Sequence, residues 1–191
     1  MPDSSDMTSR ADRRPYGRWW LLLVLFCWIM PLSARPDVNI DELKAAFVLR
    51  FVQFVDWPVE VFATTPQHSF VLCVYGDQPM AQYLRQASLR TRIDGRPLTV
   101  LQMQHAEDSL LCQAVFVPAD NPIILNAILK TTRQRPILTI SDGDNDEQGL
   151  MIRLFRHGDR LAFSIRPDDA RASRLNISAQ LLRLSQGPEQ K

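Results

Sequence analysis

The acidic run DGDNDE, residues 142–147, is the part of the sequence that most resembles a metal-binding site. Carboxylates stand at its first, third and fifth positions, the spacing with which a calcium-binding loop begins. Such a loop also needs a glycine at position six and a bidentate glutamate at position twelve, and this chain has Glu147 and Arg153 there. We therefore interpret the run as a solvated acidic loop between two strands, and we expect no metal.

The side chains that usually carry catalysis are scattered along the chain. His68, His105 and His157 lie far apart in expected loops, and none has an H-x-x-x-H or C-x-x-C partner. The sequence has no G-x-S-x-G, P-loop or G-x-G-x-x-G motif, so it lacks the signatures of nucleophilic hydrolysis and of nucleotide binding. We predict a protein that is not an enzyme and needs no cofactor.

The N-terminal segment resembles a secretory signal peptide. Four arginines precede the apolar stretch WWLLLVLFCWIMPL, which ends near the small residues Ser33 and Ala34. This stretch is about fourteen residues long, and a bilayer span needs about twenty. We therefore expect residues 1–34 to be cleaved after Ala34 and residues 35–191 to reach the periplasm. An uncleaved membrane anchor is the alternative.

The charge balance of the expected mature chain excludes one class of partner. Residues 1–34 hold four of the 22 basic and three of the 21 acidic residues, so the remaining chain is formally neutral. It also lacks a basic cluster with interleaved aromatic residues. Neither feature favours binding to nucleic acid or to an anionic lipid surface. The remaining length suits one domain with its own core.

Export would also favour a disulfide between the two remaining cysteines. Cys27 would leave with the signal segment, so Cys73 and Cys112 would remain in a compartment where disulfides form and persist. Two thiols allow one intramolecular pairing. Closing a loop of about 40 residues would stabilise the fold by about 4 kcal/mol in the chain-entropy model. Two buried free thiols are the alternative.

Apolar runs alternate with helical patterns between residues 39 and 186. We expect strands at 70–75, 98–102, 114–117 and 137–140, and a hairpin formed by 150–155 and 161–165. We expect helices from the N-cap Asn39 to Trp57, near 79–89, from the N-cap Asn121 to about 132, and at 167–184. This order predicts a single three-layer α/β domain, a mixed β-sheet with helices on both faces.

The first of these helices is unusually apolar. In KAAFVLRFVQFVDWP, residues 44–58, apolar side chains cover an arc of about 200°, roughly twice what a surface helix needs. We expect its three phenylalanines to pack against the sheet. The flank that carries Val48, Val52 and Trp57 is then the predicted surface for a dimer or a partner.

Several sequence blocks together resemble the YfiR family of exported bacterial proteins. They are LKAAFVLRFVQFVDWP, VLCVYGD, LCQAVFVP, ILTISD, QGLMIRLF, LAFSI and LNISAQLLRLS, and they extend from about Leu43 to Ser185. The resemblance implies an α/β domain that can dimerise and a disulfide between Cys73 and Cys112, in agreement with the count of thiols. The family's best-known repressor has a second cysteine pair after ILTISD. Residues 141–150 contain no cysteine, so redox regulation through a second bond is not expected.

The resemblance implies regulation as the function. The best-known family member holds a diguanylate cyclase of the inner membrane inactive by binding its periplasmic sensory part, and an outer-membrane lipoprotein sequesters that repressor. For this chain the resemblance therefore implies three partners: the periplasmic domain of an inner-membrane signalling protein, an outer-membrane lipoprotein and a second copy of the chain. The expected outcome is restrained cyclic di-GMP signalling.

A second hypothesis is a periplasmic small-molecule sensor coupled to a histidine kinase or another membrane receptor. Sheets of α/β proteins often have a ligand cleft beyond the ends of their strands. Arg96, Arg153 and Arg166 are the residues that could hold an anionic ligand there, although each also fits a solvated surface arginine.

Overall fold

The computed structural model of the chain describes residues 39–63, 69–76, 79–143 and 147–185. The expected signal peptide, His68 and the middle of the acidic run lie outside the described residues. The described residues all belong to one compact unit, Val38–Lys191.

The helices are α2 (Ile40–Gln53), η2 (Val59–Phe62), α3 (Pro79–Ser88), η4 (Ala106–Leu111), α4 (Pro122–Thr131), α5 (Pro167–Ala172) and α6 (Ala179–Leu184), where η marks a 3-10 helix. The strands are β1 (Val55–Asp56), β2 (Phe70–Tyr75), β3 (Arg92–Ile93), β4 (Arg96–Met103), β5 (Ala114–Val117), β6 (Leu138–Asp142), β7 (Ile152–His157), β8 (Arg160–Ile165) and β9 (Asn176–Ile177).

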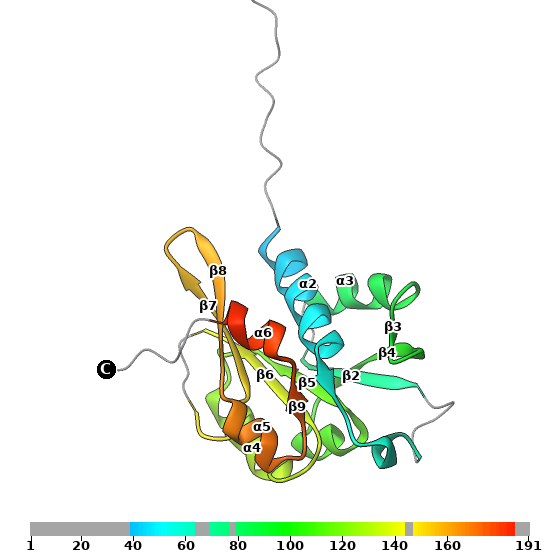
Figure 1. The fold of residues 1–191 in the computed structure, drawn as a ribbon. Helices are drawn as coiled ribbons and strands as arrows, with labels where there is room; N and C mark the ends of the chain where they lie inside the picture. The colour runs from blue at the N-terminus through cyan, green and yellow to red at the C-terminus, as the bar shows by residue number, and fades with distance from the viewer. Residues whose placement is uncertain (1–38, 64–68, 77–78, 144–146, 186–191) are drawn as a thin grey trace, which may run out of the picture. The chain divides into compact units, whose positions relative to one another are not determined.

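Seven of these strands form the mixed sheet that the sequence predicts (Figure 1). Their order is β3-β4-β2-β5-β6-β7-β8. The strands from β4 to β7 are parallel, and β3 and β8 are antiparallel to their neighbours at the two edges. After β2 the chain forms β3 and β4 on one side of that strand and then crosses to form β5 on its other side. The direction in which strands are added to the sheet therefore changes between β2 and β5.

The sheet has a hydrophobic core on each face. Successive side chains of a strand point to opposite faces, so Phe70 and Leu72 of β2 join one core with α2 and α3. Val71 and Cys73 of the same strand join a smaller core with η4 and α4. Helices therefore cover both faces, which confirms the three-layer prediction.

The two predicted N-caps, Asn39 and Asn121, act as expected. The side chain of Asn39 accepts a hydrogen bond from the backbone N–H of Asp41 at 2.9 Å, and that of Asn121 accepts one from Ile124 at 3.2 Å. Both bonds satisfy N–H groups that a helix leaves unpaired in its first turn. The predicted hairpin is also confirmed, because β7 and β8 pair along their whole length.

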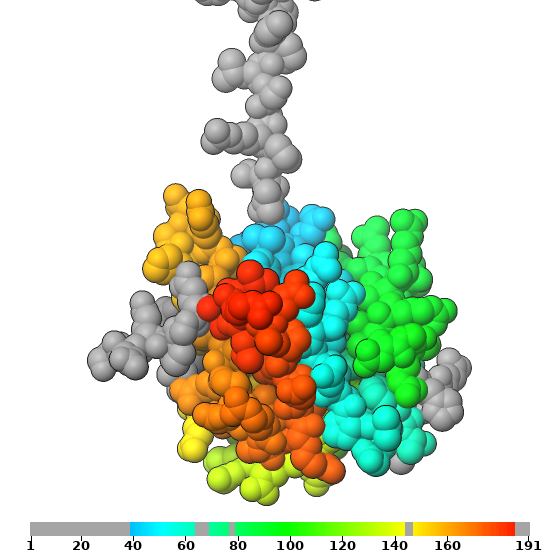
Figure 2. All heavy atoms as spheres, viewed as in Figure 1, coloured from blue at the N-terminus to red at the C-terminus, as the bar shows by residue number. Residues whose placement is uncertain are grey.

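Packing on two sides accounts for the apolar surface of α2. Its residues Phe47 and Phe51 contact Phe163 of β8, with ring centroids 5.9 and 5.0 Å apart. Helix α3 lies beside α2 over the sheet (Figure 1). Figure 2 shows the last elements of the chain, β9 and α6 among them, lying against α2 and the segment that follows it. Within the described ranges, no helix combines the length and the apolar composition that crossing a membrane requires.

Two helices are shorter than the sequence indicated. Helix α2 ends at Gln53, and the next residues form β1, which pairs antiparallel with β9 through Val55 and Ile177. The single helix predicted at 167–184 is instead α5, β9 and α6. Helix propensity is a weak preference that tertiary packing often overrides. Here β1 and β9 pair, and Ile177 of β9 and the preceding Leu175 are both buried in the core that contains α2.

Candidate functional site

The histidines of the described chain are surface residues. His105 precedes η4, with its Nδ1 atom 3.8 Å from Oδ2 of Asp108, and its side chain is 79% exposed. His157 is exposed at the end of β7. Among the residues that the structure places, no three His, Cys, Asp or Glu side chains gather to hold a metal ion.

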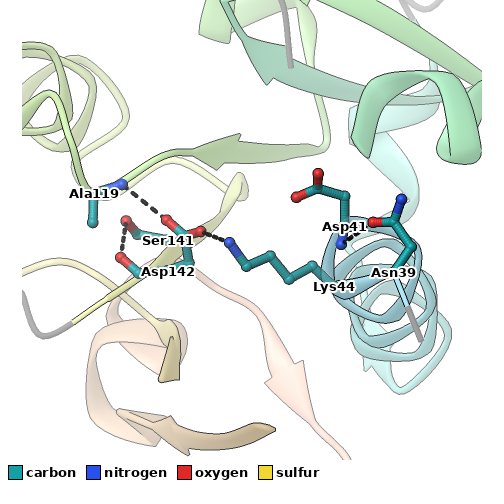
Figure 3. A network of polar contacts seen from close by, with 6 residues as sticks. All are labelled: Asn39, Asp41, Lys44, Ala119, Ser141 and Asp142. Atoms are coloured by element: carbon teal, nitrogen blue, oxygen red, sulfur yellow. Dashed lines mark hydrogen bonds and ion pairs between the residues drawn. The ribbon is translucent and has the colours of Figure 1, made fainter. Parts of the chain in front are cut away.

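Asp142, the first residue of the acidic run, belongs to a polar network inside the fold. Its Oδ2 pairs with Nζ of Lys44 on α2 at 2.5 Å, and its Oδ1 accepts a hydrogen bond from the backbone N–H of Ala119 at 2.9 Å (Figure 3). The side chains of Lys44 and Asp142 are 24% and 17% exposed. Because both carboxylate oxygens are engaged, Asp142 joins α2, β6 and the loop after β5. It supports the fold.

The three arginines proposed as ligand candidates do not share a pocket. The guanidinium carbon of Arg96 on β4 lies 4.0 Å from the ring centroid of Phe62. On β7, Nε of Arg153 donates a hydrogen bond to Oγ of Ser164 at 3.3 Å. Arg166, just before α5, lies 4.0 Å from a carboxylate of that helix. Strands β2, β5 and β6 separate β4 from β7, so no single anion site contains all three.

The flank of α2 that was predicted as a partner surface is part of the core, and that prediction was wrong. Val48 and Val52 are fully buried, and Trp57 is 7% exposed. The ring of Trp57 packs edge-on against Phe70, with centroids 4.9 Å apart, and its Nε1 donates a hydrogen bond to the carbonyl of Gln113 at 3.2 Å. The periodicity of a helix reveals how wide its apolar arc is, but not which neighbours cover that arc.

The structure contains the expected disulfide between Cys73 and Cys112. Their Cα atoms are 5.9 Å apart, and both residues are buried in the smaller core. Cys73 lies in β2, an interior strand of the sheet, and Cys112 follows η4 directly. The bond therefore fixes the end of η4 to the middle of the sheet.

A groove of about 660 Å³ lies beside this disulfide. We call it the disulfide groove. Its lining comes from η2, η4, several strands and the turns around them. The apolar lining residues are Val61, Val71, Leu101, Leu110, Leu111, Cys112, Pro136 and Ile137, and the polar ones are Ser69, Thr99, Gln113, Arg135 and Arg174.

Three leucines of the disulfide groove are accessible to a partner. Leu101, Leu110 and Leu111 are 41%, 44% and 67% exposed. Large apolar side chains that gather on a surface mark binding sites. Two other lining residues are joined by a hydrogen bond, because Oε1 of the buried Gln113 accepts one from the backbone N–H of Val71 at 2.7 Å. The leucines therefore lie beside a part of the lining that is held to β2.

Sequence reasoning missed this groove. Leu110 and Leu111 form an apolar pair just before Cys112, but two residues are too few to reveal a period. Leu101 lies in a segment that the sequence predicts as a strand. Strand periodicity does not show whether another element packs over a given side chain, so the exposure of Leu101 could not be predicted. The groove depends on segments that meet only in the folded chain.

One family model matches most of the chain. A family model described as YfiR/HmsC-like matches residues 41–186, which is most of the chain. No curated protein matches the chain significantly. The family's proteins are periplasmic, and they regulate diguanylate cyclase signalling without being catalysts themselves.

Proposed function

Because the chain belongs to the YfiR/HmsC-like family, we propose that it is a periplasmic binding protein that inhibits the sensor domain of an inner-membrane diguanylate cyclase. The observation that carries this proposal is the family match over residues 41–186. Residues 1–34 would direct export and would then be removed. The consequence for the cell is restrained production of cyclic di-GMP.

Inhibition by binding requires a difference in affinity between two states of the sensor. A ligand shifts a conformational equilibrium only as far as it prefers one state. Moving the cyclase from almost fully active to almost fully inactive takes a preference of about 10⁴-fold for the inactive state. The repressor therefore needs a surface that fits one arrangement of the sensor domain, and a rigid fold braced by a disulfide is suited to that task.

Relief of inhibition would depend on the amount of free repressor. A lipoprotein of the outer membrane that binds this chain would lower the concentration available to the cyclase, and self-association would do the same. By mass action, either competitor shifts the cyclase toward its active state without touching it. The signalling output is then set by how the chain is distributed between its partners.

A deletion of the gene in its own host tests the proposed function. Cyclic di-GMP should rise in the deletion strain and fall again when the full-length chain is restored. Crosslinking in intact cells should join the chain to an inner-membrane cyclase. If cyclic di-GMP is unchanged by deletion and no membrane signalling protein is crosslinked, the chain is not a repressor of this kind.

A further inference from the structure

We propose that the disulfide groove binds an apolar segment flanked by carboxylates on the sensor domain of the membrane partner. This inference rests on the proposed function and assigns a contact surface to it. The exposed leucines of the groove supply the apolar part of the contact. Two arginines, Arg135 and Arg174, supply its charge.

The charge of the disulfide groove has one sign. Arg135 and Arg174 are both exposed, and no described Asp or Glu forms an ion pair with either. The described lining residues include no carboxylate. Guanidinium groups bind carboxylates through paired hydrogen bonds, and such contacts are stronger beside apolar surface that excludes water. The complementary partner is therefore acidic around an apolar centre.

The backbone beneath these arginines is unusual. Arg174 has φ +60° at the end of α5, and Gln134, next to Arg135, has φ +57° after α4. Positions of this kind at a helix end favour glycine, because a side chain in the left-handed region is strained. The backbone N–H of Leu175 donates to the carbonyl of Ala170 at 2.9 Å, which closes the helix without using the Arg174 side chain. An arginine at a position where glycine suits the fold better is compatible with a role outside the fold.

The same charge argues against a second copy as the occupant. A two-fold symmetric dimer brings one surface patch against itself. If the disulfide groove formed such a two-fold interface, Arg135 and Arg174 of one chain would lie near the same residues of the other chain. The described lining residues include no carboxylate that could offset this repulsion. A heterologous acidic partner meets no such repulsion.

Charge and apolar contact can be tested separately in the deletion strain. Full-length chains carrying Arg135→Glu with Arg174→Glu, or Leu111→Asp, are expressed over a range of levels while cyclic di-GMP is measured. Half-maximal repression should require at least about tenfold more of either variant than of the wild-type chain. The matched controls are Arg85→Glu and Leu89→Asp, exposed residues at α3 on the opposite face of the sheet, and they should repress normally.

The variant Arg174→Gly separates binding from folding. Glycine relieves the strained backbone, so the melting temperature of the purified chain should stay the same or rise by a few degrees. Repression should nevertheless weaken, because the guanidinium group is lost. If Arg174 serves only the fold, Arg174→Gly should instead lower the melting temperature, and repression should weaken only as far as the folded chain is lost.

The outcomes distinguish this inference from the function on which it rests. If the wild-type chain represses and the groove variants repress as well as the controls, the groove proposal is wrong and the proposed function stands. If the wild-type chain does not change cyclic di-GMP, both are wrong. If Leu111→Asp instead converts a wild-type dimer to a monomer in solution and leaves repression intact, the groove is a contact between copies.

Discussion

At the scale of single residues, the polar contacts of this chain serve the fold. Lys44 and Asp142 come from positions 98 residues apart and meet at low exposure. Asp142 also satisfies the backbone N–H of Ala119. Removing such a carboxylate leaves a partly buried cation and a backbone donor without their acceptor, which costs more than the bond itself contributes.

This contact predicts that Asp142→Ala lowers the free energy of unfolding by about 2–3 kcal/mol. Urea denaturation of the purified chain measures the change. Asp168→Ala is the matched control, because Asp168 pairs with Arg171 where its side chain is 90% exposed, and surface pairs of this kind contribute little. Equal effects from the two substitutions would show that the Lys44–Asp142 contact has no special role in stability.

Some residue-level features could be predicted from sequence, and others depended on distant neighbours. The pairing of Cys73 and Cys112 was predictable because loss of Cys27 with the predicted signal segment would leave two thiols with one way to pair. The departure of the acidic run from the calcium-loop pattern is visible in its own residues, Glu147 and Arg153. That Asp142 would find Lys44 could not be predicted, since no local pattern links positions on a helix and a strand so far apart.

At the scale of elements, burial on more than one side explains the apolar surface of α2. The helix is covered by the sheet and by α3, and the elements at the end of the chain lie against it. Val48 and Val52 are therefore interior positions. A change at either tests folding and does not test partner binding.

A charge introduced at Val48 should prevent folding. Val48→Asp places a carboxylate in an apolar core, and we expect a loss of about 4 kcal/mol or more in the free energy of unfolding. Ala46 is exposed on the same helix, so Ala46→Asp should cost less than about 1 kcal/mol, mostly through lower helix propensity. Circular dichroism during urea titration compares them. A folded Val48→Asp chain of normal stability would place this flank on the surface after all.

Element boundaries were the weakest part of the sequence prediction. The order of strands and helices followed from apolar runs and caps, but both the end of the first helix and the middle of the last were missed. The cause is the same in each case: Val55 pairs with Ile177. A two-residue ladder between segments more than 100 residues apart leaves no local signal, yet it converts helical sequence to strand.

At the scale of the whole molecule, the disulfide connects stability to the candidate binding surface. It holds η4 against β2, and Cys112 lines the disulfide groove while Leu110 and Leu111 precede it. Loss of the bond would therefore affect both the stability of the fold and the shape of the groove.

Replacing both cysteines should destabilise the chain substantially. Cys73→Ser with Cys112→Ser opens a loop with a sequence separation of 39, and the chain-entropy model gives a loss of about 4 kcal/mol. Urea denaturation with and without a reductant measures it, and reduced wild-type chain should behave like the double variant. If reduction leaves the wild-type transition unchanged, the bond does not support the fold.

The disulfide groove is a property of the whole molecule and for that reason escaped sequence analysis. It combines leucines from β4 and η4 with arginines at the ends of α4 and α5. The leucines come from positions 101–111 and the arginines from positions 135 and 174, and each segment reads locally as an ordinary strand, turn or helix end. Only the fold brings their exposed side chains onto one surface.

A repressor of this kind should inhibit the cyclase directly when the purified chain is added to it. Membranes are prepared that contain the cyclase identified by crosslinking, with its sensor domain accessible to added protein. Cyclic di-GMP synthesis is then measured as the folded, oxidised chain is added. We expect synthesis to fall with increasing concentration of the wild-type chain and to reach a plateau. The chain that carries Arg135→Glu with Arg174→Glu should be needed at about tenfold higher concentration. Synthesis that stays unchanged at saturating wild-type chain would show that the chain does not inhibit this cyclase.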